Sequence, residues 1–119
     1  MNPHSENLGL LKRLEYLMNK LYSPIMNFPR PARQVVGQSI LRDMTSIISY
    51  VSLANSVKSM RMKHLQTADG HIESMYILLK LSRNKKCISK GFFREIDEEL
   101  TIIKSMLIKM IRTANKPSK

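Results

Sequence analysis

The chain of 119 residues is poor in the residues that build sheets and covalent cross-links. It has no Trp, an aromatic content of only 6%, four Gly and five Pro, which is little turn material for an all-β fold. Its single cysteine, Cys87, excludes an internal disulfide framework and metal sites built on several cysteines. No apolar run reaches the roughly 20 residues that span a bilayer, and residues 1–5 lack the pattern of a signal peptide. We therefore expect one domain in the cytoplasm, with no membrane partner.

Acidic residues are also scarce, because nine Asp and Glu stand against 20 Lys and Arg and leave a formal net charge of +11. Such a small basic domain repels itself unless anions accept the charge, and nucleic acid is the commonest partner of this kind. Charge alone leaves an anionic membrane or an acidic protein open as alternatives, although we expect no membrane partner. The hydrophobic content of 43% is sufficient for one core, and nine Met beside many Leu and Ile favour packed helices.

Apolar residues recur at spacings of three and four in four stretches that are bounded by helix breakers. They predict helices over about residues 5–26, 31–58, 61–82 and 89–114, with a polar tail over 115–119. We expect Ser89 to cap the last helix and Gly70 to lie at a close contact between helices. Because short connections make each helix antiparallel to the previous one, the predicted fold class is all-α, an up-down-up-down four-helix bundle.

The excess positive charge gathers in the third predicted helix and at both ends of the bundle. Residues 74–94 contain no acid, and the candidate binding residues of this stretch are Lys80, Arg83, Lys85, Lys86 and Lys90. The first loop should add Arg30 and Arg33 at the same end, whereas Lys58, Arg61 and Lys63 belong to the opposite end. This surface predicts salt-dependent phosphate binding, with a merely solubilising surface as the alternative. No aromatic stacking array is evident beside these residues, so sequence-specific reading of single strands is not indicated.

Groups that could perform catalysis are few. His64 and His71 share a helix face near Glu73, but a metal site would lack a further ligand at helical spacing. The acids over 95–99 suit a solvated face in the N-terminal half of a helix better than a pair of catalytic carboxylates. Cys87 has basic neighbours, which leaves a redox role as a minor alternative. Since a Gly-rich phosphate loop is also missing, we expect no enzyme activity, no cofactor and no metal.

A series of short motifs along the chain resembles a known family. In chain order the motifs are Phe28-Pro29-Arg30, Arg33, Gly37 with Ile40, Ala54-Asn55, Leu65 with Ala68-Asp69, Leu78-Leu79-Lys80-Leu81 and Ser89. Over about residues 8–112 this series is similar to the four-helix bundle family that includes the accessory variability determinant (Avd) of diversity-generating retroelements. The same family includes the proteins encoded in ribosomal RNA intervening sequences.

The resemblance implies a homopentameric barrel of bundles with a strongly basic surface. Members in retroelements associate with the reverse transcriptase and with template-repeat RNA, or RNA/DNA hybrid, and support the error-prone copying that diversifies a target gene. By position, the partner-binding charge of the family falls on Lys80 and Arg83, whereas Tyr76 replaces a basic residue of some relatives. Lys104-Ser105-Met106 stands where the family often has Gly and Trp. We expect a retroelement accessory protein, with a general RNA-binding or scaffolding bundle as the alternative.

Overall fold

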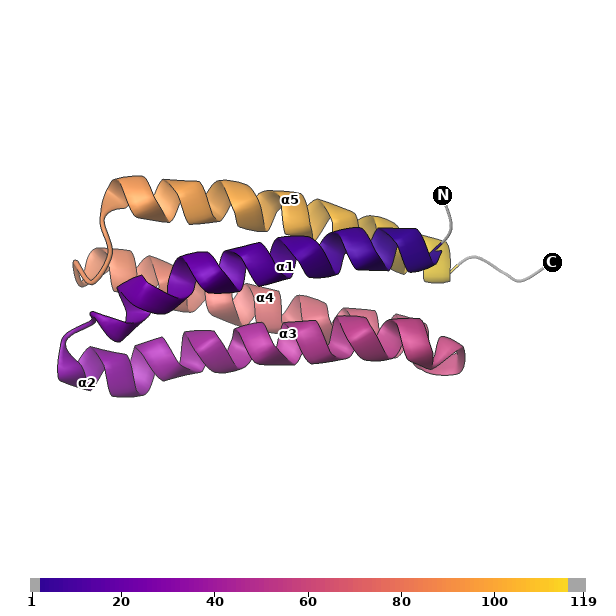
Figure 1. The fold of residues 1–119 in the computed structure, drawn as a ribbon, viewed down its shortest axis with the longest axis horizontal. Coiled ribbons are helices and arrows are strands. Elements are labelled where there is room, and N and C mark those ends of the chain that lie inside the picture. Colours follow the sequence, from indigo (N-terminus) through magenta and orange to yellow (C-terminus); the bar gives the residue numbers. More distant parts are fainter. Residues whose placement is uncertain (1–2, 116–119) are drawn as a thin grey trace.

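The computed structural model describes residues 3–115, with side chains from Asn7 onward, and within this range every regular element is helical (Figure 1). The long helices are α1 (Pro3–Met26), α3 (Gln38–Ser56), α4 (Arg61–Asn84) and α5 (Lys90–Ala114). The short elements are α2 (Arg30–Ala32), the π-helical segment η1 (Arg33–Gly37) and the 3-10 segment η2 (Lys58–Met60). The all-α fold class with four main helices is therefore confirmed.

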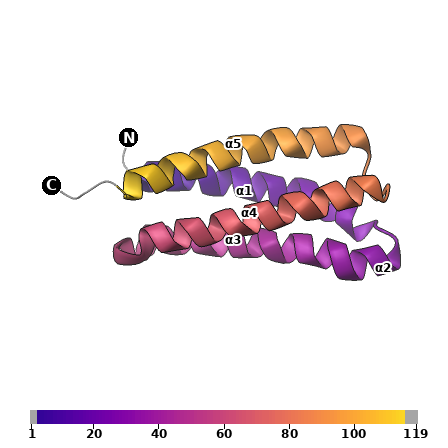
Figure 2. The same ribbon diagram turned by 180° about the vertical axis from the view of Figure 1, so that it is seen from behind.

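The four long helices lie side by side and alternate in direction (Figures 1 and 2). α1 packs against α3 and α5, and α4 packs against the same two helices. The connection that contains α2 and the connection from α4 to α5 lie at one end of the bundle, which we call the loop end (Figure 1). The connection from α3 to α4 lies at the opposite end, near the end of α5. This topology determines which distant parts of the sequence share a surface.

The predicted apolar stripes form one continuous core. On α1 the five residues of the stripe are all buried, and the equivalent stripes of α3, α4 and α5 face them. The buried residues of α1 are Leu10, Leu14, Leu17, Leu21 and Ile25. Because a helix repeats every 3.6 residues, this spacing keeps the aliphatic side chains on one face, and burying each contributes about 1.5–3 kcal/mol before entropic costs.

The predicted helix over 31–58 differs from the structure in two ways. Its first part contains the π-helical turn of η1, and α3 ends at Ser56 because Val57 leaves the helical conformation with φ −120° and ψ 89°. Gly37, the last residue of η1, is buried, and a Cβ there would lie 2.8 Å from Cγ2 of Ile25. A glycine is therefore needed where the end of α1 packs against the π-helical turn.

The close contact expected at Gly70 is absent, so that prediction is wrong. Gly70 is exposed on α4, and no atom of the described residues lies within 4 Å of the position that a Cβ would occupy, apart from its own helix backbone and chain neighbours. The residue at the close approach is instead Gly37. Both glycines follow a helical pattern in sequence, and only the path of the neighbouring chain distinguishes them.

Two helix ends at the loop end have well-defined hydrogen bonds. Ser89 is the N-cap of α5, as expected, and its hydroxyl accepts a hydrogen bond from the backbone N–H of Phe92 at 3.0 Å. α4 ends in a Schellman turn, in which the N–H of Cys87 donates to the carbonyl of Ser82 and the N–H of Lys86 to that of Arg83. These bonds satisfy groups that the helix ends would leave without partners.

Candidate nucleic-acid interface

The loop end brings together basic residues from two distant parts of the sequence. Arg30 and Arg33 belong to the connection after α1 (Figure 1). Lys85 and Lys86 belong to the connection between α4 and α5, and Lys90 is the first residue of α5. Lys58, Arg61 and Lys63 lie at the opposite end, beside the connection from α3 to α4. The candidate residues therefore form two separate basic regions.

Two of the candidate arginines also hold the fold together. The guanidinium of Arg33 donates a hydrogen bond to the carbonyl of Met26 at 3.3 Å, and Nε of Arg61 donates to the carbonyl of Ala54 at 2.9 Å. Each accepting carbonyl lies in the last turn of the preceding helix, where a cation also interacts favourably with the helix dipole. Substitution of either arginine therefore changes stability as well as surface charge.

Lys86 occupies a backbone conformation that favours glycine. Its φ of 62° makes it the one non-glycine residue with positive φ among the described residues. The residue after the C-cap of a Schellman turn adopts this left-handed conformation, and a side chain there costs about 1–2 kcal/mol. The turn thus presents a lysine on the exposed surface at a position where glycine would be more stable.

Lys80 and Arg83 are both positioned by aromatic rings. Nζ of Lys80 lies 4.7 Å from the ring centroid of Tyr76, and Cζ of Arg83 lies 4.4 Å from that of Phe93. The two rings, one from α4 and one from α5, have centroids 6.1 Å apart. No array of stacking aromatic residues was expected beside the basic residues, and the structure places one ring beside each of these two cations. The four-residue spacing of Tyr76 and Lys80 was visible in the sequence, whereas the contact with Phe93 depends on the fold.

Three hollows follow the seam between α4 and α5, and together we call them the α4–α5 groove. The outer hollow, of about 500 Å³, is lined by Arg83, Asn84, Lys86, Cys87, Ile88, Ser89 and Lys90. The middle hollow, of about 340 Å³, is lined by Arg83, Lys90, Phe93, Arg94 and Asp97. The inner hollow, of about 300 Å³, is lined by Ile72, Glu73, Tyr76, Asp97, Leu100, Thr101, Lys104 and Ser105. Neighbouring hollows share residues: Arg83 and Lys90 line the first two, and Asp97 lines the last two.

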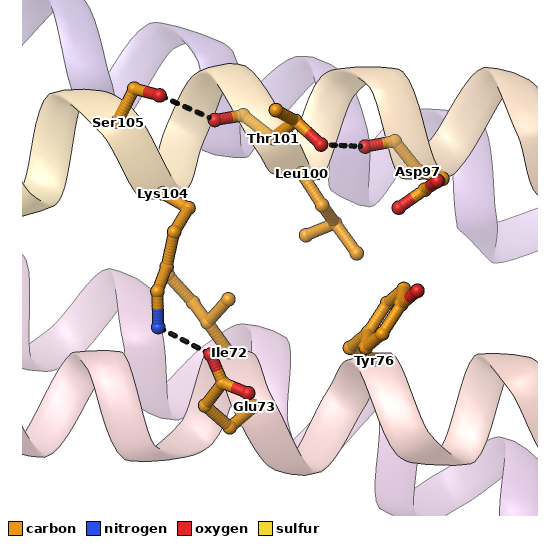
Figure 3. Close-up of a pocket in the computed structure, with 8 residues that line it drawn as sticks. All are labelled: Ile72, Glu73, Tyr76, Asp97, Leu100, Thr101, Lys104 and Ser105. Carbon is orange, nitrogen blue, oxygen red and sulfur yellow. Dashed lines mark hydrogen bonds and ion pairs between the residues drawn. The ribbon is translucent and has the colours of Figure 1, made fainter.

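The inner hollow has an apolar floor and polar walls (Figure 3). Tyr76 extends from α4, and the Asp97 carboxylate extends from α5 into the space between the helices (Figure 3). Within the described residues this carboxylate forms no hydrogen bond or ion pair. The hydroxyl of Thr101 donates to the backbone carbonyl of Asp97 at 2.8 Å and keeps its capacity to accept.

Lys104 closes the far side of the inner hollow. Its ammonium group forms ion pairs with Asp69 and Glu73 on α4, and Figure 3 shows the pair with Glu73. Partial burial lowers the pKa of Lys104, but the hydrogen bonds to Asp69 and Glu73 outweigh burial and hold the pKa above its ordinary value of 10.5. Lys104 is therefore a charged tie between α4 and α5.

The acids of α5 do not form one solvated face, in contrast to the expectation. Glu95 pairs with Lys20 on α1 at 3.6 Å, and Glu99 pairs with Arg13 on the same helix at 3.1 Å. Asp97 faces the α4–α5 groove instead. Neighbouring positions on a helix point in different directions, so Glu95 and Glu99 face α1 whereas Asp97 faces α4.

His64 and His71 lie between α3 and α4, away from the groove. Nδ1 of His71 lies 2.9 Å from Oδ1 of Asp43, and the rings of His71 and His64 both contact Tyr50. The other carboxylate oxygen of Asp43 is buried and has no hydrogen-bond partner within the described residues. No group of three or more His, Cys, Asp or Glu in residues 3–115 is arranged to hold a metal ion.

The fold and surface together define a class: an antiparallel four-helix bundle with a basic loop end and a groove between two helices. The fold of this chain is similar to the 1.70 Å crystal structure of a protein of unknown function from the S23 ribosomal protein family, from Bacteroides thetaiotaomicron VPI-5482. The TM-score is 0.78 at 18% sequence identity, over 93% of this chain and 98% of the other.

The similarity to that solved structure establishes the bundle fold and nothing finer. No family model matches the sequence, and a search of curated proteins finds no match. None of the helices in residues 3–115 has the length and apolar character needed to cross a bilayer. The function is therefore inferred from the basic groove.

Proposed function

We propose that the chain is a non-enzymatic, cytoplasmic accessory protein of a diversity-generating retroelement. It binds the reverse transcriptase and the template-repeat RNA through its basic surface and supports mutagenic reverse transcription and retrohoming. The observation that carries this proposal is the position of Arg83 and Lys90, each of which lines both the middle and the outer hollow of the α4–α5 groove. The assignment to a retroelement comes from the sequence resemblance, whose partner-binding charge includes Arg83.

The basic residues of the groove, together with Lys80 beside Tyr76 on α4, suit a phosphate backbone. Lys and Arg that neutralise phosphates release bound counterions, which drives binding that weakens as salt rises. The rings of Tyr76 and Phe93 hold Lys80 and Arg83 in place, so less side-chain entropy is lost when RNA binds.

Self-association is the second part of the proposal. A pentamer, as the resemblance implies, would carry about five times the charge of +11 and would hold RNA at several points at once. Large apolar side chains are exposed on the outer side of α4, with Ile77 61% and Leu81 38% exposed one turn apart. Burial of these residues between copies of the chain would remove apolar surface from water.

The alternative is a general RNA-binding or scaffolding bundle without a polymerase partner. The solved structure of similar fold is named for a ribosomal protein family, which favours an RNA-related role without a polymerase. The genes beside this one distinguish the two functions. A reverse-transcriptase reading frame with a near-identical pair of repeats supports the retroelement, whereas their absence supports the alternative.

Charge reversal tests the binding surface directly. The double variant Lys80→Glu/Arg83→Glu should lose most RNA binding in a filter assay. It should also fail to retain the reverse transcriptase in a pull-down, whereas its helical circular dichroism should not change. The matched control is Lys12→Glu/Lys109→Glu, which makes the same change of charge at two exposed residues outside the groove. Unaltered binding by the first variant, or an equal loss by both, contradicts the assignment of this surface.

A further inference from the structure

The α4–α5 groove changes its chemical character along its length. The inner hollow has an apolar and aromatic floor of Ile72, Tyr76 and Leu100. Its walls are polar, with the ion pair of Glu73 and Lys104 and the hydroxyls of Thr101 and Ser105. The outer part is basic, and one acid, Asp97, lies where the two parts meet. A nucleotide has the same order of chemistry, from an apolar base through a ribose with hydroxyl groups to an anionic phosphate.

The inner hollow fits a single base. Its volume of about 300 Å³ lies at the lower end of the range of small-molecule pockets. The ring of Tyr76 offers an aromatic contact, which is the usual way in which proteins hold unpaired bases. The hydroxyls of Thr101 and Ser105 and the Glu73 carboxylate are acceptors for the amino groups on the edge of a base.

The position of Asp97 fits a ribose. Its carboxylate has no partner within the described residues and faces the groove between the apolar and the basic hollows (Figure 3). A carboxylate accepts hydrogen bonds only, and the ribose 2′-hydroxyl is a donor that DNA lacks. An acid beside Arg83, Lys90 and Arg94 weakens phosphate binding unless it makes such a contact.

The basic residues decide between RNA and protein as the occupant. A basic peptide would also match the acids of the inner hollow, but its continuation along the groove would lie against the cations of the middle and outer hollows. A phosphate attached to the bound nucleoside is attracted by the same cations. Charge complementarity along the whole groove therefore favours a nucleotide.

We propose that the α4–α5 groove binds one unpaired ribonucleotide of an RNA strand. The base occupies the inner hollow against Tyr76, the 2′-hydroxyl donates to Asp97, and the phosphate lies against the basic residues of the middle hollow. This inference rests on the proposed RNA binding and adds a preference for RNA over DNA. It makes Asp97 a specificity-determining residue.

The test compares a short single-stranded RNA with the DNA of the same sequence by fluorescence anisotropy at matched salt. The wild-type protein should bind the RNA roughly tenfold more tightly than the DNA, because one hydrogen bond to a charged group changes an affinity by about this factor. Asp97→Ala should weaken RNA binding to the level of DNA and leave DNA binding no weaker. Asp97→Asn keeps the shape and an accepting oxygen, so it should retain part of the preference.

Glu98→Ala is the matched control, because Glu98 is exposed on the same helix outside the groove. Loss of a negative charge alone would strengthen binding of both polymers equally in either variant. Tyr76→Leu should weaken RNA and DNA alike by about tenfold, as loss of base stacking does.

Three results overturn the nucleotide site. They are equal affinity of the wild-type protein for RNA and DNA, tighter binding of both polymers by Asp97→Ala, and loss of reverse transcriptase binding with unchanged RNA binding in Asp97→Ala or Tyr76→Leu. In each of these cases, the loss of RNA binding on charge reversal of Lys80 and Arg83 still supports the proposed function. A wild-type protein that binds neither polymer overturns both proposals.

Discussion

The guanidinium of Arg83 lies over the ring of Phe93, with Cζ 4.4 Å from the ring centroid. The ring belongs to α5 and is only 7% exposed, so a buried side chain of α5 positions the Arg83 cation at the surface of the bundle. A cation over an aromatic face at an accessible site contributes about 0.5–1 kcal/mol. Arg83 is thereby both a part of the α4–α5 junction and a wall of two hollows.

Phe93→Leu separates these two roles of Arg83. Leucine keeps an apolar group at the buried position but removes the aromatic face, so we expect a loss of about 1–2 kcal/mol in unfolding free energy. RNA affinity should fall less than in Arg83→Gln, because the charge is retained but no longer positioned. Urea unfolding and anisotropy measure the two effects. Phe92→Leu is the control, since Phe92 lies beside Phe93 and has no cation over its ring within the described residues.

Lys86→Gly should change stability and binding in opposite directions. Glycine adopts a φ of 62° without strain, so the unfolding free energy should rise by about 0.5–1 kcal/mol. Loss of one cation should weaken RNA binding and lower the slope of log affinity against log salt by about 0.7. Thermal unfolding and a salt series of anisotropy titrations measure both quantities.

Lys85→Gly is the matched control for Lys86→Gly. Lys85 has a φ of −89°, so its replacement by glycine removes a charge but relieves no strain. We expect weaker RNA binding without a gain in stability. A similar gain in both variants would contradict the argument from the left-handed conformation.

The burial pattern of the bundle could be predicted from the sequence because it depends on periodicity alone. Leu14, Ile47 and Leu107 lie in three different stripes, and all three are fully buried. A stripe of large aliphatic side chains has only one favourable position, facing the other stripes. The cap at Ser89 was equally local, since its hydroxyl bonds a backbone group three residues away.

The candidate site could be predicted only in part, because its chemistry depends on pairs of residues far apart in sequence. The acid-free stretch identified Lys80 and Arg83, but the inner hollow exists only because α4 and α5 bring Tyr76 and Asp97 together. In the sequence Asp97 is one of several neighbouring acids, and only the orientation of α5 distinguishes it. Long-range geometry of this kind leaves no periodic signal.

Two glycine substitutions should have opposite effects on stability. Gly37→Ala places a Cβ 2.8 Å from Cγ2 of the buried Ile25, so we expect a loss of about 1–3 kcal/mol. Gly70→Ala adds a methyl group in open space on an exposed helix, so it should gain about 0.5–1 kcal/mol. Urea unfolding of the isolated chain measures both values, and a loss in Gly70→Ala would point to a close contact at that position.

Lys104→Met tests the charged tie between α4 and α5 through its pH dependence. The hydrogen bonds to Asp69 and Glu73 raise the folded-state pKa of Lys104 above 10.5, whereas the unfolded value stays near ~10.4. The stabilisation is therefore fully present below the unfolded pKa and is lost as pH rises through the raised folded pKa. At pH ~7 the variant should be less stable by up to about 1 kcal/mol, since the group is partly exposed.

The difference between wild type and Lys104→Met should shrink as pH rises above ~10.5 and through the raised folded-state pKa of Lys104, where the folded wild-type protein loses the ammonium proton. The comparison cancels the pH dependence of every group that the two proteins share. Lys109→Met is the control, since Lys109 is exposed on α5 and forms no ion pair within the described residues. It should change stability little at either pH. An equal difference at both pH values for Lys104→Met would assign its effect to packing of the lysine stem rather than to its charge.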